Sequence, residues 1–555
     1  MRDHAMTAPS DRGTAWPGAE AARRTGDQFE TRPETEKVDG PPPSTPFRSI
    51  LFRDPGDARD IGRIGTPEYF GDLNLDQIVT SITAAKQDYN LRPFFYAPLR
   101  SVEAVKYRHE VMRDLEESDI LDCIQRFAAG MRLMRERLAL AEKLYYSLQK
   151  QRWFLAAAEA YCDAVTKLQD RLPRLSPHST GLRSFCQYLN AYASSTRFAV
   201  LTRTVGDLVR DLTAIRYCVQ IRGSGFTVRG YEAEQDYSAE VTETFAKFRQ
   251  GEARDYRAEL RASRDMNHIE AKILEFVSLL NEDIFARMTE FATRQRAFAD
   301  TLLLTFDREI QFYVAYLDHL IPLRKAGLGF CYPELSTTDK QVRVDDAFDL
   351  ALANKLTANK SPVICNEFHL DDPERIFVVS GPNQGGKTTF SRTFGQMHHL
   401  ASIGCPVPGR NAKLFLFDAM FTHYERAEAI ANLHGKLQDD LLRIHAILER
   451  ATPRSIIIMN EIFTSTTLMD AVFLARKVME RIIALDCLCV CVTFLEELAS
   501  LGEKTVSMVS TVARDDTAQR TFKVIRRPAD GRAYAISIAE KYRLTYDAIK
   551  GRIAP

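Results

Sequence analysis

Gly381-Pro-Asn-Gln-Gly-Gly-Lys-Thr-Thr389 is the stretch that decides the fold of this 555-residue chain. It has the spacing G-x-x-x-x-G-K-[ST], which is typical of a loop that cradles phosphate groups between a strand and a helix. The run Arg375-Ile-Phe-Val-Val-Ser380 predicts a buried strand before it, and the apolar spacing from Thr388 to Leu400 predicts a helix after it. Glycines let backbone N–H groups face phosphate oxygens, and the helix N-terminus adds the positive end of its dipole. We therefore expect a nucleoside triphosphate to bind to Gly381, Pro382, Asn383, Gln384, Gly385, Gly386, Lys387, Thr388 and Thr389.

A second predicted strand supplies the polar groups that phosphate chemistry needs. Ser455-Ile-Ile-Ile-Met-Asn-Glu461 has four apolar residues followed by polar ones at its end. Phosphate-loop ATPases usually end this strand in Asp-Glu, where the Asp supports the Mg²⁺ shell and the Glu polarises the attacking water. We therefore predict Glu461 and Lys387 as catalytic residues, and Thr388 and Asn460 as the residues that hold Mg²⁺. Because an Asn side chain brings no negative charge, weakened Mg²⁺ binding is expected.

Composition limits the class of protein. The chain is 45% hydrophobic and 27% charged, as in ordinary globular proteins, and its length predicts two or more domains. Its 74 Lys and Arg residues balance 74 Asp and Glu residues, which excludes a generally basic nucleic-acid coat protein but allows a local basic patch. Cys487, Cys489 and Cys491 alternate in an apolar run that predicts a core strand rather than a metal or redox cluster. The sequence shows neither a signal peptide nor an apolar run of ~18 residues, so a cytoplasmic protein without membrane contact is expected.

Patterning along the chain predicts a multidomain fold, with a mainly α-helical core or lever domain followed by an α/β P-loop ATPase domain of ABC type. Residues 1–48 are rich in Pro, Thr, Gly and charge, which predicts a disordered tail. Residues 49–335 form the predicted helical domain, and residues 336–555 form the predicted ATPase domain, to which the family resemblance described below also assigns dimerisation. Within the helical domain, three-to-four-residue apolar spacing predicts long helices over 120–149, 153–172 and 268–319.

Two short segments carry further predictions. Tyr217-Cys-Val-Gln-Ile-Arg-Gly-Ser-Gly-Phe-Thr-Val-Arg-Gly230 predicts a β-hairpin around a Gly-Ser-Gly turn. Arg216, Arg222 and Arg229 in or beside it are candidate phosphate contacts, with a purely solvated role as the more common alternative for such arginines. The adjacent His398 and His399 would point about 100° apart on a helix, which argues against a shared metal ion.

These motifs together resemble the MutS mismatch-repair ATPase family. The resemblance rests on the loop 381–389 and on four further stretches: Ala97-Pro-Leu-Arg-Ser-Val-Glu-Ala-Val-Lys-Tyr-Arg108, Ile403-Gly-Cys-Pro-Val-Pro408, Asn460-Glu-Ile-Phe-Thr-Ser-Thr-Thr467 and Ala539-Glu-Lys-Tyr-Arg-Leu-Thr-Tyr546. It implies ATP with Mg²⁺ as the cofactors, a homodimer whose ATPase sites are completed in trans, and helical levers that engage DNA under nucleotide control.

Three positions depart from the family pattern, and they define the alternatives. Asn460 replaces an Asp, Phe494 replaces the His of a Thr-His pair, and Gly435-Lys436 stands where the family has its trans-acting Ser. No mismatch-reading N-terminal domain is recognisable. The expected function is a MutS-like ATPase of DNA repair or recombination. The alternatives are a nucleotide-dependent scaffold with little hydrolysis and a chromosome-organising ATPase, which would need sustained heptads beyond those in residues 120–320.

Overall fold

The computed structural model describes residues 47–54, 56, 64–223, 225–232, 266–425, 435–513, 520–528, 546 and 549–550. The tail predicted for residues 1–48 therefore lies outside the described residues, except for Phe47 and Arg48. The same holds for most of the C-terminal stretch 539–546.

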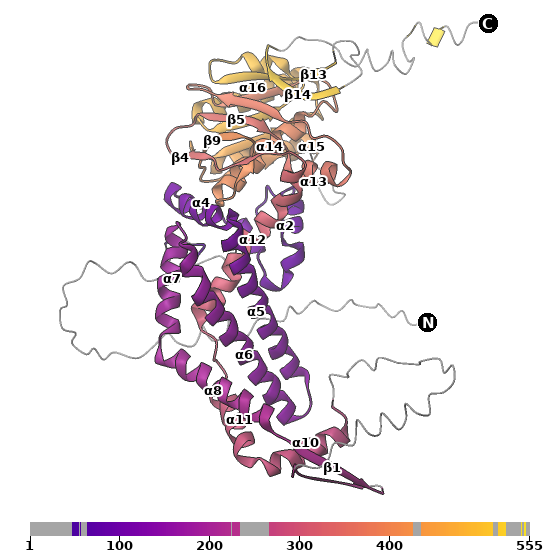
Figure 1. Cartoon of the computed structure of the whole chain (residues 1–555). Helices are drawn as coiled ribbons and strands as arrows, with labels where there is room; N and C mark the ends of the chain where they lie inside the picture. Colours follow the sequence, from indigo (N-terminus) through magenta and orange to yellow (C-terminus); the bar gives the residue numbers. More distant parts are fainter. Residues whose placement is uncertain are drawn as a thin grey trace, which may run out of the picture. The chain divides into compact units, whose positions relative to one another are not determined.

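Helices make up most of the described chain between residues 75 and 325 (Figure 1). Their bounds are α2 Leu75–Thr83, η2 Ala84–Tyr89, α3 Arg92–Tyr96, α4 Val102–Glu116, α5 Ser118–Lys143, α6 Ser147–Arg171, η3 Leu172–Leu175, α7 Thr180–Ala193, α8 Thr196–Ala214, α10 His268–Leu280, α11 Glu282–Arg294 and α12 Thr301–Lys325. In Figure 1, α5 and α6 run side by side. Their backbones approach closely because Gly130 faces Ala164, where a Cβ on the glycine would lie 2.6 Å from the Ala164 Cβ.

The continuous helix predicted over 268–319 is wrong, because two polar residues divide it. The Asn281 side chain donates to the Val277 carbonyl and closes α10, and α11 begins at the next residue. The Asp300 carboxylate then accepts from the N–H groups of Leu302 and Leu303 and caps α12. The helices predicted over 120–149 and 153–172 exist, but the break between them lies at Leu144–Tyr146 rather than at residues 150–152.

The predicted hairpin is confirmed. Strands β1 Tyr217–Arg222 and β2 Gly225–Gly230 pair antiparallel, with Tyr217 opposite Gly230 and Ile221 opposite Phe226. The hairpin packs against α10, where the Phe226 ring lies 6.0 Å from that of Phe276 (Figure 1).

A six-stranded sheet dominates the C-terminal half, in the order β10-β11-β12-β7-β13-β14. Five of its strands are parallel and β14 is antiparallel. The bounds are β7 Ile376–Ser380, β10 Met420–His423, β11 Ile456–Asn460, β12 Leu488–Val492, β13 Thr505–Val512 and β14 Arg520–Arg526. Helix α14 Lys387–Ser402 packs on one face of this sheet, and α15 Lys436–Arg450 and α16 Leu468–Leu485 pack on the other. Cys487, Cys489 and Cys491 are buried in or directly before β12, which confirms the predicted core strand.

Smaller elements complete this half of the chain. A four-stranded sheet has the order β4-β9-β5-β6, and β3 pairs with β8. Their bounds are β3 Phe330–Cys331, β4 Glu334–Ser336, β5 Val342–Ala347, α13 Leu350–Ala358, β6 Asn366–Leu370, β8 Val407–Pro408, β9 Asn411–Phe415 and η4 Glu496–Ser500.

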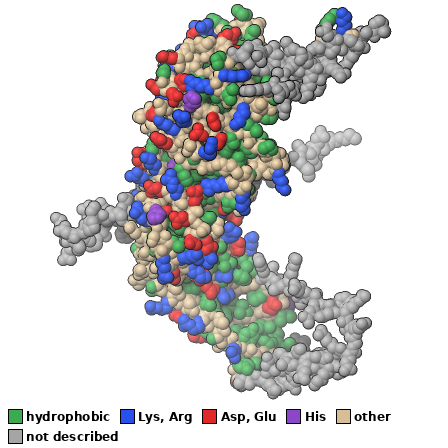
Figure 2. Space-filling model, turned by 45° about the horizontal axis from the view of Figure 1, so that its top comes forward, with side chains coloured by type: hydrophobic (Ala, Val, Ile, Leu, Met, Phe, Trp, Pro, Cys, Tyr) green, Lys and Arg blue, Asp and Glu red, His purple; other side chains and the backbone are tan. Residues whose placement is uncertain are grey.

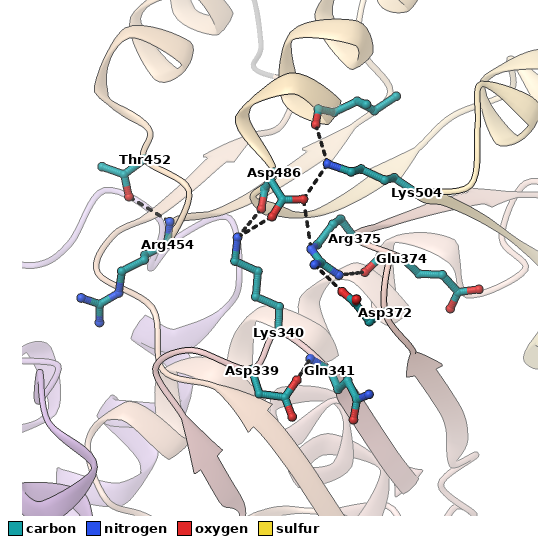
Figure 3. A network of polar contacts seen from close by, with 11 residues as sticks. Asp339, Lys340, Gln341, Asp372, Glu374, Arg375, Thr452, Arg454, Asp486 and Lys504 are labelled. Atoms are coloured by element: carbon teal, nitrogen blue, oxygen red, sulfur yellow. Dashed lines mark hydrogen bonds and ion pairs between the residues drawn. The ribbon is translucent and has the colours of Figure 1, made fainter.

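A charge network joins the amino ends of several strands (Figure 3). The Asp486 carboxylate, just before β12, accepts from Lys504 Nζ at 2.7 Å and from Lys340 Nζ at 2.9 Å. Arg375 Nε lies 3.2 Å from the same carboxylate, directly before β7. The network therefore fastens the sheet at the edge opposite the carboxyl ends of its parallel strands.

Helix α14 also contacts the N-terminal helical segments along its length. Arg392 donates to the Asp72 carbonyl, Gln396 to the Leu73 carbonyl, and Arg108 to the Ile403 carbonyl, at 2.9, 2.9 and 2.8 Å. The helix that begins at the predicted phosphate loop is thus held by residues far earlier in the sequence.

Candidate functional site

The predicted phosphate loop lies at the carboxyl edge of the parallel strands. It leaves β7 at Ser380 and enters α14 at Lys387. The carboxyl ends of β11 and β12 meet the same edge: Asn460 ends β11, Glu461 follows it, and Thr493 follows β12, the neighbour of β7. Open parallel sheets bind ligands at this edge, where the strand order reverses around a central strand.

Glycine is required within the loop for two separate reasons. Gly381 and Gly386 have φ values of 116° and 94°, which side chains disfavour. A Cβ at Gly381 or at Gly385 would lie 2.5 Å from the Ser510 Oγ, because β13 runs directly beside the loop. The tight fit leaves space for backbone N–H groups and no space for side chains.

Lys387 is buried and held by the loop itself. Its Nζ donates to the Gly381 carbonyl at 3.0 Å, to the Pro382 carbonyl at 3.2 Å and to Asn383 Oδ1 at 3.4 Å. The Phe494 ring covers the ammonium, with its centroid 4.3 Å away. Burial lowers the pKa of Lys387, and the nearby Glu461 charge opposes that effect. To bind an incoming anion, the Lys387 ammonium, which is shielded from water, would have to exchange its hydrogen bonds to the loop for bonds to that anion.

The two predicted Mg²⁺ residues are brought together. Thr388 Oγ1 donates to Asn460 Oδ1 at 3.0 Å, which joins the first turn of α14 to the end of β11. Both offer neutral oxygen atoms, and Mg²⁺ prefers oxygen ligands with few from the protein and the rest from phosphates and water. The pair fits Mg²⁺ bound together with a triphosphate, but it supplies no negative charge of its own.

Glu461 follows Asn460 in a left-handed backbone conformation with φ 56°. Its N–H donates to the Val492 carbonyl at 2.8 Å, which fixes the residue between the ends of β11 and β12. The half-buried carboxylate is close enough to act electrostatically on Lys387. The remaining predicted loop residues are exposed or half-buried: Asn383, Gln384 and Thr389.

The comparisons with known proteins identify the family. A family model described as MutS domain V matches residues 377–551, which include the loop, Asn460 and Glu461. The chain is a member of a MutS-like family. The DNA mismatch repair protein MutS of Orientia tsutsugamushi is 27% identical over 231 residues, which are 41% of this chain and 25% of that protein. The MutS protein of Brevibacillus brevis is 28% identical over 217 residues, 38% of this chain and 25% of the relative.

This MutS-like chain matches only part of its relatives. The matched regions span about a quarter of the length of these two MutS proteins. The longest of the quoted matches, to MutS of Rickettsia rickettsii, is 25% identical over 287 residues, which are 49% of this chain and 32% of that protein. Within the described part of the chain, no helix is both long enough and apolar enough to cross a membrane.

Sequence reasoning missed three residues that contact the loop. Ser510 of β13 packs against Gly381 and Gly385, and its buried Oγ has no hydrogen-bond partner. Arg520, the first residue of β14, donates from Nε to the Asn383 carbonyl at 3.2 Å. Phe522 lies beside Gly386, whose Cβ position is 3.6 Å from the Phe522 carbonyl oxygen. No motif marks them, because the pairing of β13 with β7 and of β14 with β13 brings them to the loop.

The structure describes contacts of the other two departures from the family pattern, Phe494 and Gly435-Lys436. Phe494 lies on Lys387, as described above. Gly435 directly precedes α15, and Lys436 forms an ion pair with Glu425. Residues 426–434 lie outside the described part of the chain.

The remaining predicted residues lie outside this site. Arg216 lies just before β1 and Arg222 ends it, and both side chains are exposed. Arg229 lies in β2, and its Nη1 is 3.7 Å from a carboxylate oxygen of Glu232, two residues after the strand.

His398 and His399 are buried in α14, and burial lowers the pKa of each to about 4, so both are neutral at pH 7. Their ring nitrogens bond the Phe394 and Phe95 carbonyls. Among the described residues, no group of three or more His, Cys, Asp or Glu side chains could hold a metal ion.

Proposed function

We propose that this chain is an ATPase that binds ATP with Mg²⁺ on residues 381–389 and couples the bound nucleotide to helices that engage DNA in repair or recombination. The observation that carries the proposal is the contact between Thr388 and Asn460 at 3.0 Å, beside Lys387 and Glu461. A strand-end oxygen, a loop hydroxyl, a cation and a carboxylate meet where a triphosphate and its metal ion would lie. The MutS relatives support DNA as the partner and repair as the process.

Each residue has a defined task in this mechanism. Mg²⁺, when bound, neutralises charge on the phosphates, and Thr388 and Asn460 would hold it. Lys387 exchanges its bonds to loop carbonyls for bonds to phosphate oxygens. Glu461 orients a water molecule and accepts its proton as the oxygen attacks the γ-phosphorus. The bond from that phosphorus to the β-phosphate oxygen breaks, which yields ADP and inorganic phosphate.

Steady-state phosphate release tests the catalytic proposal. The variants Lys387→Ala and Glu461→Gln should each lower turnover by about 100-fold or more, the range found when a catalytic electrostatic or general-base group is removed. Arg476→Ala on the exposed face of α16 is the matched control and should turn over as the wild type does. Release that persists in the Lys387 and Glu461 variants would contradict the assignment of both residues.

A nucleotide-dependent scaffold is the second candidate, and the surroundings of Lys387 favour it. The ammonium is covered by Phe494 and bonded to the loop, and Asn460 lacks a charge, so ATP binding with little hydrolysis is a coherent outcome. Titration of ATP at equilibrium, with phosphate release measured in the same samples with and without DNA, separates the two candidates. Binding without release favours the scaffold, and in that case Asn460→Asp should raise turnover if the missing charge is the cause.

Homodimerisation through residues 336–555 is part of the same proposal, on the strength of the family resemblance. Light scattering coupled to size-exclusion chromatography, with and without a non-hydrolysable ATP analogue, measures the mass directly. A monomer mass under both conditions would remove the trans-completed site from the proposal.

A further inference from the structure

Strand β14 brings an arginine to the phosphate loop that the motif does not include. In the antiparallel pairing of β13 with β14, Arg520 lies opposite Val512. Val512 ends β13, whose parallel partner β7 leads into the loop, so Arg520 starts its strand at the carboxyl edge of the sheet. The position follows from the strand pairing and not from the loop sequence.

Two cationic side chains form hydrogen bonds with the same loop residue, Asn383. Arg520 Nε donates to the Asn383 backbone carbonyl at 3.2 Å, while Lys387 Nζ lies 3.4 Å from the Asn383 side-chain oxygen. The guanidinium and the ammonium are thus separated by one residue. Further along β14, Phe522 contacts Gly386 at the other end of the loop. Strand β14 therefore contacts the loop at Asn383, through its arginine, and at Gly386.

The two like charges interact. Arg520 bonds the Asn383 backbone carbonyl oxygen and Lys387 bonds the Asn383 side-chain oxygen. Two cations held this close repel each other unless an anion lies between or beside them. The arrangement of Arg520 and Lys387 around Asn383 thus favours a bound anion at this end of the loop.

The position along the loop indicates which phosphate is involved. In loops of this kind, backbone N–H groups near the helix N-terminus hold the α- and β-phosphates, and the lysine reaches the β- and γ-phosphates. Gly386 is the residue before α14, whereas Lys387 Nζ reaches back to Gly381, Pro382 and Asn383. Arg520 lies with the lysine ammonium at the end where the γ-phosphate is expected.

We propose that Arg520 is a phosphate-binding residue that contacts the γ-phosphate of the nucleotide within the same subunit. The inference rests on the proposed nucleotide site. A guanidinium presents several N–H donors in a planar fork, so it bonds phosphate oxygens with directional, charge-assisted contacts. The arginine supplies positive charge to the γ-phosphate at a site whose Mg²⁺ residues, Thr388 and Asn460, are both neutral. It thereby distinguishes ATP from ADP.

Equilibrium binding of ATP and ADP, each with Mg²⁺, tests this by isothermal titration calorimetry on the full-length protein. Hydrolysis is prevented with the Glu461→Gln variant as the common background. Arg520→Ala should weaken ATP binding by about tenfold and ADP binding by less than about twofold, as expected for the loss of one charge-assisted contact to the γ-phosphate. Arg520→Lys keeps the charge and should retain part of the preference. Arg476→Ala is the matched arginine control on α16, and it should change neither affinity.

The outcomes separate this inference from the proposed function. A merely structural role for Arg520 would lower the melting temperature or weaken both nucleotides equally, and equal weakening would overturn the assignment. Unchanged affinities in Arg520→Ala would overturn it as well. If the Glu461→Gln background and the wild type bind neither nucleotide, the proposed function itself fails. A selective loss for ATP supports the assignment.

Discussion

Asp486 shows at the scale of one residue how charge is distributed in this protein. The carboxylate lies among Lys504, Lys340 and Arg375 at the amino edge of the large sheet (Figure 3). Partial burial acts to raise its pKa, but the hydrogen bonds from Lys504 and Lys340 and the charges of the basic residues outweigh burial and lower the pKa from 3.8 to about 2. The ionised carboxylate therefore stabilises the fold.

We expect Asp486→Asn to reduce the free energy of unfolding by about 1 kcal/mol at pH 7, a modest value because a third of the side chain is exposed and screened by water. Since the pKa in the folded state is depressed, the contribution is present above pH 3.8 and is lost as the pH falls toward 2. Urea denaturation of wild type and variant between pH 7 and pH 3 measures it. Their difference should be constant above about pH 5 and should shrink below 3.8.

The control is Asp372→Asn, whose exposed carboxylate pairs with Arg375 alone and should contribute almost nothing. A difference between wild type and Asp486→Asn that grows as the pH falls would contradict the argument. At the opposite edge of the sheet, Asn460 is the residue-scale contrast, because its amide gives the Thr388 hydroxyl an uncharged partner at the predicted metal position.

At the scale of elements, the packing of α5 on α6 depends on one missing side chain. Gly130 in α5 faces Ala164 in α6, and an added Cβ would lie 2.6 Å from the Ala164 Cβ. Gly206 in α8 is also within a helix, but an added Cβ there would meet nothing within 4 Å. The two glycines make a matched pair, because alanine improves helix propensity equally at both.

We expect Gly206→Ala to stabilise the protein by about 0.5–1 kcal/mol, the usual gain from replacing a glycine within a helix. Gly130→Ala should instead destabilise it by about 1–3 kcal/mol, because overpacking forces the two helices apart. Thermal or urea denaturation of both variants provides the comparison. Stabilisation by Gly130→Ala would show that α5 and α6 can separate at no cost.

Patterns in the sequence correctly predicted those elements that depend on residues adjacent along the chain. The Gly-Ser-Gly turn between alternating residues gave the hairpin 217–230, and the apolar run around Cys489 gave β12. The break at Asn281 was missed, because apolar spacing continues across this residue, which ends α10 directly before the first residue of α11. Arg520 and Ser510 were missed for another reason: they reach the loop through strand pairing, which spacing along the chain does not reveal.

At the scale of the molecule, α14 is the element that would connect the proposed nucleotide to the N-terminal helices. Its first turn carries Lys387 and Thr388, and its last turns contact residues 73, 95 and 108 of the N-terminal helical segments. Arg108 is fully buried there, bonded to the Leu51 and Ile403 carbonyls. A shift of α14 on nucleotide binding would therefore also displace α4, because the buried contact of Arg108 is close-packed and leaves no free space for movement.

The proposed DNA contact is the whole-molecule property that the charge distribution constrains most. Lys and Arg side chains are interspersed with Asp and Glu side chains over the face shown in Figure 2, and the net charge of the chain is zero. No broad positive patch covers that face, so phosphate contacts on it would have to come from local groups. The exposed Arg216 and Arg222 beside the β1–β2 hairpin are our proposed contacts.

The double variant Arg216→Ala/Arg222→Ala should weaken DNA binding, because two phosphate contacts are lost together with the counterions that they displace. Fluorescence anisotropy at several salt concentrations measures both affinity and its salt dependence for homoduplex, mismatched and branched DNA. We expect the slope of log affinity against log salt to fall by about 2 in magnitude, nearly equally for all three DNA structures, because phosphate contacts carry no sequence information. The matched control Arg476→Ala/Lys477→Ala removes two exposed charges from α16 and should leave the slope unchanged. The slope depends only on those charges that neutralise phosphates. If it changes in the control and not in the hairpin variant, the DNA contact lies at α16 and the assignment to the hairpin is wrong.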